Sequence, residues 1–238
     1  MTDAAARLAS SLIADSRLPT GAYAHSGGFE PAVLAGLGVD DVLPFLLSRL
    51  RTVSRMEAAA SVLAYRAALR APDAGVGADF HVRAGAEFRV LAGALDARTP
   101  SAAQRDASRR LGRGLLRLLA SIAPEAPAVV ALGDAVPRPA RPLALGVFGA
   151  VFGLDEAAVA HACCYDDAQS VVAAAQKLLP LDPMTGPRWL LSAADELDAV
   201  VREACAVNGT ADLPAPSAPW MEHWAEQHVT RTKRLFVS

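Results

Sequence analysis

The stretch SAAQRDASRRLGRGLLRLLASI, residues 101–122, decides the fold class of this chain. Its arginines stand four apart and therefore stay close to one face of a helix, while its large apolar residues mark another face. The two sets are Arg105, Arg109, Arg113 and Arg117, and Leu111, Leu115, Leu118 and Ile122. The segment predicts an amphipathic helix, with Pro100 ending the element before it and Ser101 as its N-cap.

The row of arginines has two interpretations. It is either a solvated face of the helix, or a surface that docks an acidic protein or a phosphate-bearing partner. Nucleic acid is disfavoured, because no aromatic residues are interleaved with the arginines and the net charge of the whole chain is −2.

The same three- and four-residue spacing of apolar positions recurs along most of the chain, and no segment shows sustained alternation with a period of two. We therefore expect an all-α fold, a single-domain bundle of about ten helices. The expected helices span about 4–15, 27–36, 41–70, 77–97, 101–122, 126–135, 142–152, 155–179, 187–206 and 218–230.

The C-terminal part differs in composition from the rest. Residues 208–219 are rich in Pro, Gly, Ala and Ser, which is typical of a surface linker. We therefore divide the chain into a helical bundle, residues 1–207, and a linker with a C-terminal partner-binding segment, residues 208–238. The tail from Arg231 to Ser238 is expected to be mobile by itself and to become ordered against a partner.

Composition excludes several classes of protein. The mean hydropathy of +0.25 reflects alanine, the best helix former, and the longest strongly apolar stretch, residues 142–154, is too short to cross a bilayer. The N-terminus does not resemble a signal peptide, and the odd number of cysteines does not suggest a disulfide framework. A cytoplasmic location with reduced thiols is expected.

The common signatures of nucleotide, zinc and redox sites are absent from the sequence. Residues 24–28, AHSGG, imitate a nucleophile elbow, so a small serine hydrolase that uses Ser26 and His25 is the alternative function. An elbow needs a strand before it, whereas residues 9–16 have a helical pattern. The simpler interpretation is a tight turn between two helices, shaped by glycines and capped by Ser26.

A metal site is not predicted. His161, Cys163 and Cys164 lie in one expected helix, but residues 161 and 164 share a face and residue 163 does not. Buried packing is the more common role of cysteine.

Residues 18–30, LPTGAYAHSGGFE, resemble the LP-x-G-x-[FY]-x-HS-x-G-x-E segment of the urease accessory protein family UreF. Further similarity lies in residues 108–116, which resemble the R-x-G helix of the family, in residues 146–154, in residues 177–186, and in the ending RLFVS at residues 234–238. Departures include Arg141 before Pro142, where the family usually has histidine, and Val229 after His228, where it usually has glutamate.

The resemblance implies a helical, cytoplasmic, non-enzymatic scaffold. Such a protein forms a homodimer and bridges UreD (also called UreH) and the GTPase UreG during nickel insertion into the urease apoprotein. It implies no cofactor of its own, since nickel and GTP are handled mainly by the partners, and it implies neither catalytic nor metal-ligating residues. The partner-binding residues implied are Tyr23, His25, Ser26, Glu30, Arg110, Tyr165, His228, Arg234, Leu235 and Phe236.

Overall fold

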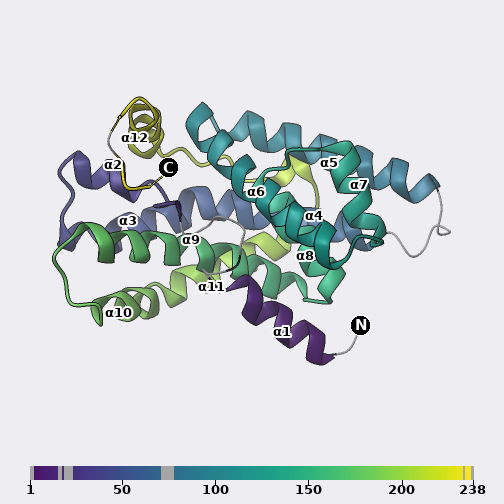
Figure 1. The fold of residues 1–238 in the computed structure, drawn as a ribbon, viewed down its shortest axis with the longest axis horizontal. Coiled ribbons are helices and arrows are strands. Elements are labelled where there is room, and N and C mark those ends of the chain that lie inside the picture. The colour runs from purple at the N-terminus through teal and green to yellow at the C-terminus, as the bar shows by residue number, and fades with distance from the viewer. Residues whose placement is uncertain (1–2, 16–17, 19–23, 71–77, 233, 237–238) are drawn as a thin grey trace.

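The computed structural model describes residues 3–15, 18, 24–70, 78–232 and 234–236. These residues form helices joined by short connections, with no strand among them, so the all-α prediction is confirmed (Figure 1). The α-helices are α1 (Asp3–Ile13), α2 (Phe29–Leu34), α3 (Val42–Arg49), α4 (Arg55–Leu69), α5 (Ala78–Arg98), α6 (Ala102–Ile122), α7 (Pro127–Ala135), α8 (Arg141–Phe152), α9 (Glu156–Leu178), α10 (Thr185–Ser192), α11 (Ala194–Ala206) and α12 (Pro219–Val229). Two 3-10 turns, η2 (Val39–Asp41) and η4 (Thr210–Asp212), and a π-helical turn, η3 (Leu50–Ser54), complete the described elements.

Most helix boundaries follow the local chemistry that the sequence suggests. The Ser101 hydroxyl caps α6 by accepting a hydrogen bond from the Gln104 amide at 3.2 Å, and α9 begins after Asp155 and ends before Pro180. Two expectations are wrong. The predicted helix at 187–206 is two helices that meet at Ala193, and Ser26 does not cap α2, because the N-cap position is Gly28 in the left-handed region, with φ of 79°.

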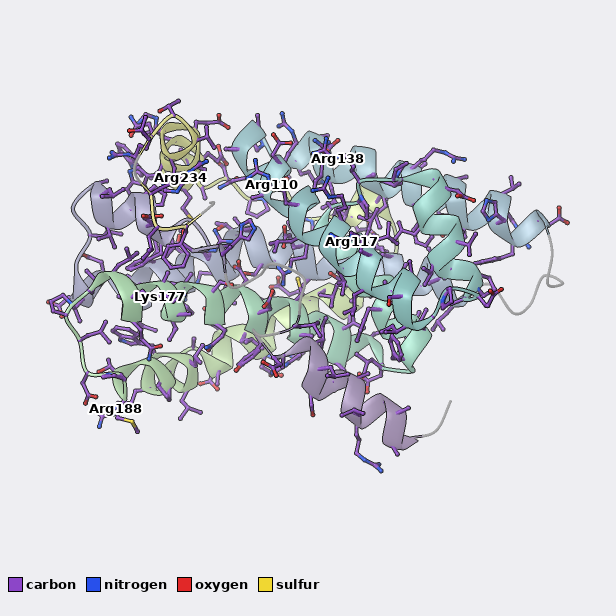
Figure 2. All side chains as sticks on the ribbon, in the orientation of Figure 1. Arg110, Arg117, Arg138, Lys177, Arg188 and Arg234 are labelled. Atoms are coloured by element: carbon purple, nitrogen blue, oxygen red, sulfur yellow. The ribbon has the colours of Figure 1, made fainter. Side chains whose placement is uncertain are left out.

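The C-terminal tail packs on the protein, which corrects the expectation that it is mobile by itself. Phe236 is 4% exposed and belongs to the same buried cluster as Leu213, Met221 and the core of the bundle. Figure 1 shows the described end of the chain between α12, α2 and α9, and Figure 2 shows Arg234 on the same side of the molecule. The physical reason is that a buried carboxylate binds the backbone amides of the tail, as described below.

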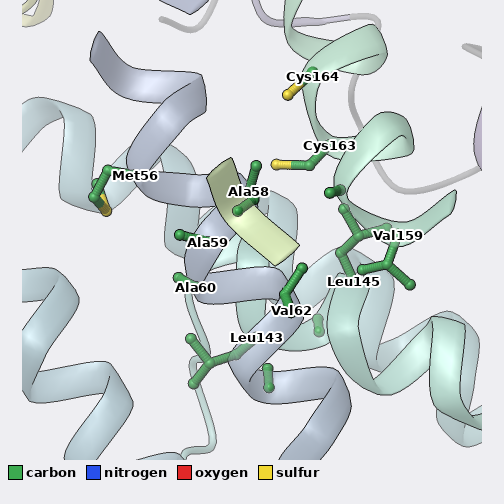
Figure 3. Close-up of a cluster of buried hydrophobic side chains, with 14 of the residues drawn as sticks. Met56, Ala58, Ala59, Ala60, Val62, Leu143, Leu145, Val159, Cys163 and Cys164 are labelled. Atoms are coloured by element: carbon green, nitrogen blue, oxygen red, sulfur yellow. The ribbon is translucent and has the colours of Figure 1, made fainter. Parts of the chain in front are cut away.

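Helix α4 lies at the centre of the bundle and packs against α8, α9, α11 and α5. Its alanines and the glycines of α8 let the backbones approach closely: a Cβ at Gly146 would lie 2.3 Å from the Ser61 carbonyl oxygen and 2.6 Å from the Tyr65 nitrogen. Figure 3 shows this region, with labelled side chains of α4 (Val62), α8 (Leu145) and α9 (Val159 and Cys163), all members of one buried cluster. Small residues therefore set the spacing of the central helices.

None of the helices within the described residues is sufficiently long and apolar to span a membrane.

Candidate partner-binding site

The loop before α2 is turned inward. His25 is 9% exposed and Ser26 is fully buried, so neither side chain of these two predicted partner-binding residues is presented at the surface. Gly27 and Gly28 have φ of 60° and 79°, values that L side chains rarely adopt, and this pair makes the tight turn into α2. Tyr23 lies outside the described residues.

Glu30, the last residue of the matched segment, holds the C-terminal tail. Its buried carboxylate accepts hydrogen bonds from the backbone amides of Leu235 at 2.6 Å and Phe236 at 2.8 Å. The His228 Nε2 lies 3.4 Å from Glu30 Oε2 and 3.3 Å from the Phe236 carbonyl oxygen, and Lys177 Nζ lies 5.0 Å from the centre of the Phe236 ring. We call Glu30, His228 and the backbone of residues 235–236 the tail clamp.

The tail clamp joins segments that are more than 200 positions apart in the sequence, as the separation of 206 between Glu30 and Phe236 shows. Burying a polar side chain is costly unless it is hydrogen-bonded, and the two tail amides donate to both oxygens of the Glu30 side chain. Arg234 and Leu235 remain exposed, Leu235 with 63% of its surface accessible. The clamp therefore anchors the tail by its backbone and by Phe236, and leaves two of the predicted partner-binding side chains free to make contacts.

A buried ion pair lies beneath the loop. Asp167 of α9 accepts hydrogen bonds from Arg49 at 3.0 Å and 2.5 Å and from the Ser54 hydroxyl at 2.6 Å. Arg49 and Ser54 are five residues apart. In the π-helical turn η3 hydrogen bonds join residues five apart, so this turn brings the two side chains to the same side. Burial would raise the pKa of Asp167, but the Arg49 guanidinium lowers it below its usual value.

Arg141 forms a second buried group of charges next to this pair. Its guanidinium lies 3.0 Å from Glu57 Oε2 and 3.2 Å from Asp166 Oδ2, and it donates to the Cys163 carbonyl oxygen at 2.8 Å. Burial raises the pKa of Glu57, an effect that Arg141 opposes. Burial would also lower the pKa of Arg141, yet the neighbouring Cys163, Asp166 and Glu57 together raise it, so it remains charged. Arginine at this position thus links α8 to α4 and α9.

A cavity of about 130 Å³ separates the loop from α4, α6 and α12. Its lining includes His25, Arg49, Glu57, Arg110, Arg141 and His228. Burial, followed by the charges of Arg110 and Arg141, lowers the pKa of His25 to about 4. His25 is therefore neutral near pH 7. The loop, His228 of the tail clamp and the buried charges line one common space.

Two further predicted residues lie outside the tail clamp, one on the rim of the cavity and one on another face. Tyr165 is half-buried on α9 and stacks on the exposed His161 ring, with centroids 6.3 Å apart and planes at 8°. Arg110 is exposed on α6, at the edge of the cavity. The structure therefore brings together His25, Ser26, Glu30, His228, Leu235 and Phe236, whereas Tyr165 occupies a separate face.

The UreF family model matches residues 38–194, which is more than half of the chain. This chain belongs to the UreF family. The resemblance found in the sequence is confirmed, and the matched range includes α3, η3, α4, α8 and α9, which carry the buried charges.

Three named relatives extend the similarity over nearly the full length. Urease accessory protein UreF of Mycobacterium marinum is 40% identical over 228 residues, which cover 95% of this chain and 96% of that protein. The protein of the same name from Mycobacterium bovis BCG Pasteur is 35% identical with the same coverage, and that of Mycolicibacterium vanbaalenii is 37% identical over 231 residues, again covering 95% of this chain and 96% of the relative. The UreF family model leaves out residues 1–37 and 195–238, and these alignments are long enough to include most of them.

Sequence reasoning missed Arg49, Glu57 and Asp167, which carry the buried charges under the loop. The only local signal is a charged residue inside a run of small or apolar residues in an expected helix, such as Glu57 before three alanines. The partners of these residues are distant, 118 positions in the case of Arg49 and Asp167, so their pairing required the tertiary structure. No group of three or more metal-ligating side chains occurs among the residues that the structure describes.

Proposed function

We propose that this chain is a urease accessory protein that acts as a non-enzymatic scaffold in the maturation of urease. The observation that carries the proposal is membership of the UreF family, with relatives named urease accessory protein UreF at 35–40% identity across 95% of the chain. In this proposal the chain works in the cytoplasm, and nickel is the cargo of the reaction and GTP the substrate of a partner.

The proposed partners are UreD (UreH), UreG and the urease apoprotein. UreD binds the tail, because Leu235 and Arg234 are exposed on a segment that the tail clamp already holds in place. UreG approaches the neighbouring loop and α6, where Arg110 is exposed. A homodimer forms through the face of α9 that carries Tyr165 and the exposed His161.

The burial of the loop argues against the serine hydrolase alternative. Ser26 has no exposed surface, whereas a nucleophile must reach the carbonyl carbon of its substrate. His25, with a pKa of about 4, is a weak base near pH 7. The burial of Ser26 and the low pKa of His25 together lead us not to retain this alternative.

The first experiment reconstitutes urease from purified apoprotein, UreD, UreG, nickel and GTP, with and without this chain. Ammonia release that depends on the chain is the expected result, and activation that is the same without it contradicts the proposal.

The second experiment tests the tail. Truncation would remove buried residues of α12 such as Met221, so a point substitution is the sharper test. Leu235→Glu is expected to abolish UreD binding, measured by size-exclusion chromatography, while Leu191→Glu, at a leucine with 77% exposure on α10, keeps it. Retained binding by both variants would contradict the assignment of the tail.

A further inference from the structure

Four exposed arginines gather on α6 and on the segment that follows α7. They are Arg110, Arg113, Arg117 and Arg138, which we call the arginine face. Figure 2 shows Arg110, Arg117 and Arg138 on one side of the molecule. Among the residues that the structure describes, none of these four arginines forms a salt bridge with a carboxylate.

The geometry of α6 makes this a continuous surface. Arg110, Arg113 and Arg117 follow each other at intervals of three and four residues and so share one face over about 10 Å of helix axis. Arg138 is brought to it by a close backbone contact, since a Cβ at Gly112 would lie 2.2 Å from the Pro139 carbonyl oxygen. Glycine at position 112 thus lets the segment that carries Arg138 rest on α6.

The other arginines of α6 are engaged within the chain. Arg105 donates to the carbonyl oxygens of Thr99 at 2.6 Å and Pro100 at 2.8 Å, and Arg109 pairs with Asp96 at 2.6 Å. The row of arginines that the sequence suggests is therefore divided: two members are used internally, while Arg113 and Arg117 join Arg110 and Arg138. Like charges three and four residues apart destabilise a helix slightly, and Asp106, the one acidic residue of α6, lies 4.0 Å from Arg109 instead of pairing with these arginines.

We propose that the arginine face docks an acidic surface of a protein partner. Charge complementarity is the argument: four positive groups stand together on a chain whose net charge is −2, and guanidinium groups bind carboxylates with two parallel hydrogen bonds. The face carries no aromatic side chain on which a base could stack, which favours protein over nucleic acid. Arg110 also lowers the pKa of His25, so the face adjoins the loop and its cavity.

This inference rests on the proposed function, because the acidic partner is then one of the maturation proteins. The test compares two single variants that change the net charge equally. Arg117→Glu alters the arginine face, and Arg188→Glu alters an exposed arginine of α10, far from α6 in Figure 2. Isothermal titration with purified UreD and with purified UreG gives Kd at about 50 mM and about 500 mM salt.

Arg117→Glu is expected to weaken one of the two complexes by about tenfold at low salt and by less at high salt, while Arg188→Glu changes Kd less than about twofold. Arg117→Lys should weaken the complex less than Arg117→Glu does, since the charge remains while the paired guanidinium hydrogen bonds are lost. Suppose that the wild-type chain binds its partners and activates urease, but that Arg117→Glu and Arg188→Glu have equal Kd values. This result would overturn the inference and leave the proposed function standing. A wild-type chain that binds neither partner contradicts the proposed function, and the inference fails with it.

A single-stranded RNA oligonucleotide is the competing probe in the same titration. Binding of this RNA by the wild type, its loss in Arg117→Glu and unchanged affinity for both proteins would show a nucleic-acid surface and overturn the proposal.

Discussion

Glu30 and Phe236 are joined by a hydrogen bond of 2.8 Å between a side-chain carboxylate near the start of the chain and a backbone amide near its end. The carboxylate is buried together with His228, whose Nε2 lies 3.4 Å from Glu30 Oε2. Because a backbone amide is available at every position except proline, the partner of Glu30 does not depend on which side chain the tail carries. Phe236 then fixes the register by filling a buried position.

Glu30→Gln tests the tail clamp. An amide side chain has one acceptor oxygen and would place its own donors toward the tail amides, so we expect a loss of about 1–3 kcal/mol in the free energy of unfolding. Urea denaturation measures this loss, and faster cleavage by trypsin after Arg231 would report release of the tail. Glu125→Gln, at an exposed carboxylate, is the control and should match the wild type. Equal trypsin rates for all three proteins would rule out the clamp.

His25 gives the chain a specific dependence on pH. Its pKa is lowered from 6.5 to about 4, so the unfolded state binds the proton between these values and the folded state does not. Stability is then full above pH 6.5 and is lost as the pH falls towards 4, by about 2 kcal/mol between pH 7 and pH 5. His25→Asn should remove this part of the dependence, as measured by urea denaturation at both pH values, whereas His223→Asn, at an exposed histidine, should leave it. A wild-type slope in His25→Asn would contradict the assignment.

Gly146→Ala tests the contact between α4 and α8. The added methyl group would lie 2.3 Å from the Ser61 carbonyl oxygen, a backbone atom that cannot move without separating the helices. We expect destabilisation by about 2–3 kcal/mol. Gly133→Ala in α7 is the matched control, since a Cβ there meets nothing within 4 Å, and it should be neutral or stabilising. Thermal denaturation compares the two, and the same midpoint for both would show that the close approach is not required.

Asp167→Ala leaves Arg49 buried without its carboxylate. Breaking a buried pair in this way is expected to cost about 3–5 kcal/mol. Asp198→Ala removes the partner of Arg202 on the exposed face of α11 and should cost less than about 1 kcal/mol. Urea denaturation of both variants measures the difference, and a small loss in Asp167→Ala would mean that water replaces the ion pair.

The helices could be predicted from the sequence because each depends on neighbours in the chain. Ser101 and Asp155 cap their helices through hydrogen bonds to residues three positions away. The spacing of the leucines in α6 indicates which face of this helix is buried. The break at Ala193 was missed, since no glycine or proline marks it. Near the start of α10, a Cβ added at Gly186 would lie 2.8 Å from Val172 of α9, so glycine at this position has a tertiary reason.

The sequence by itself therefore determined the helical class, most helix boundaries, the family and the importance of residues 24–30 and of the tail, because these depend on short-range spacing and on motif identity. The tertiary structure decided what those residues do to one another. It turned His25 and Ser26 inward, paired Glu30 with the tail and Arg49 with Asp167, and left Arg110, Arg113, Arg117 and Arg138 together on the surface. The physical reason is that burial and ion pairing depend on which distant segments meet, and local spacing carries no information about that.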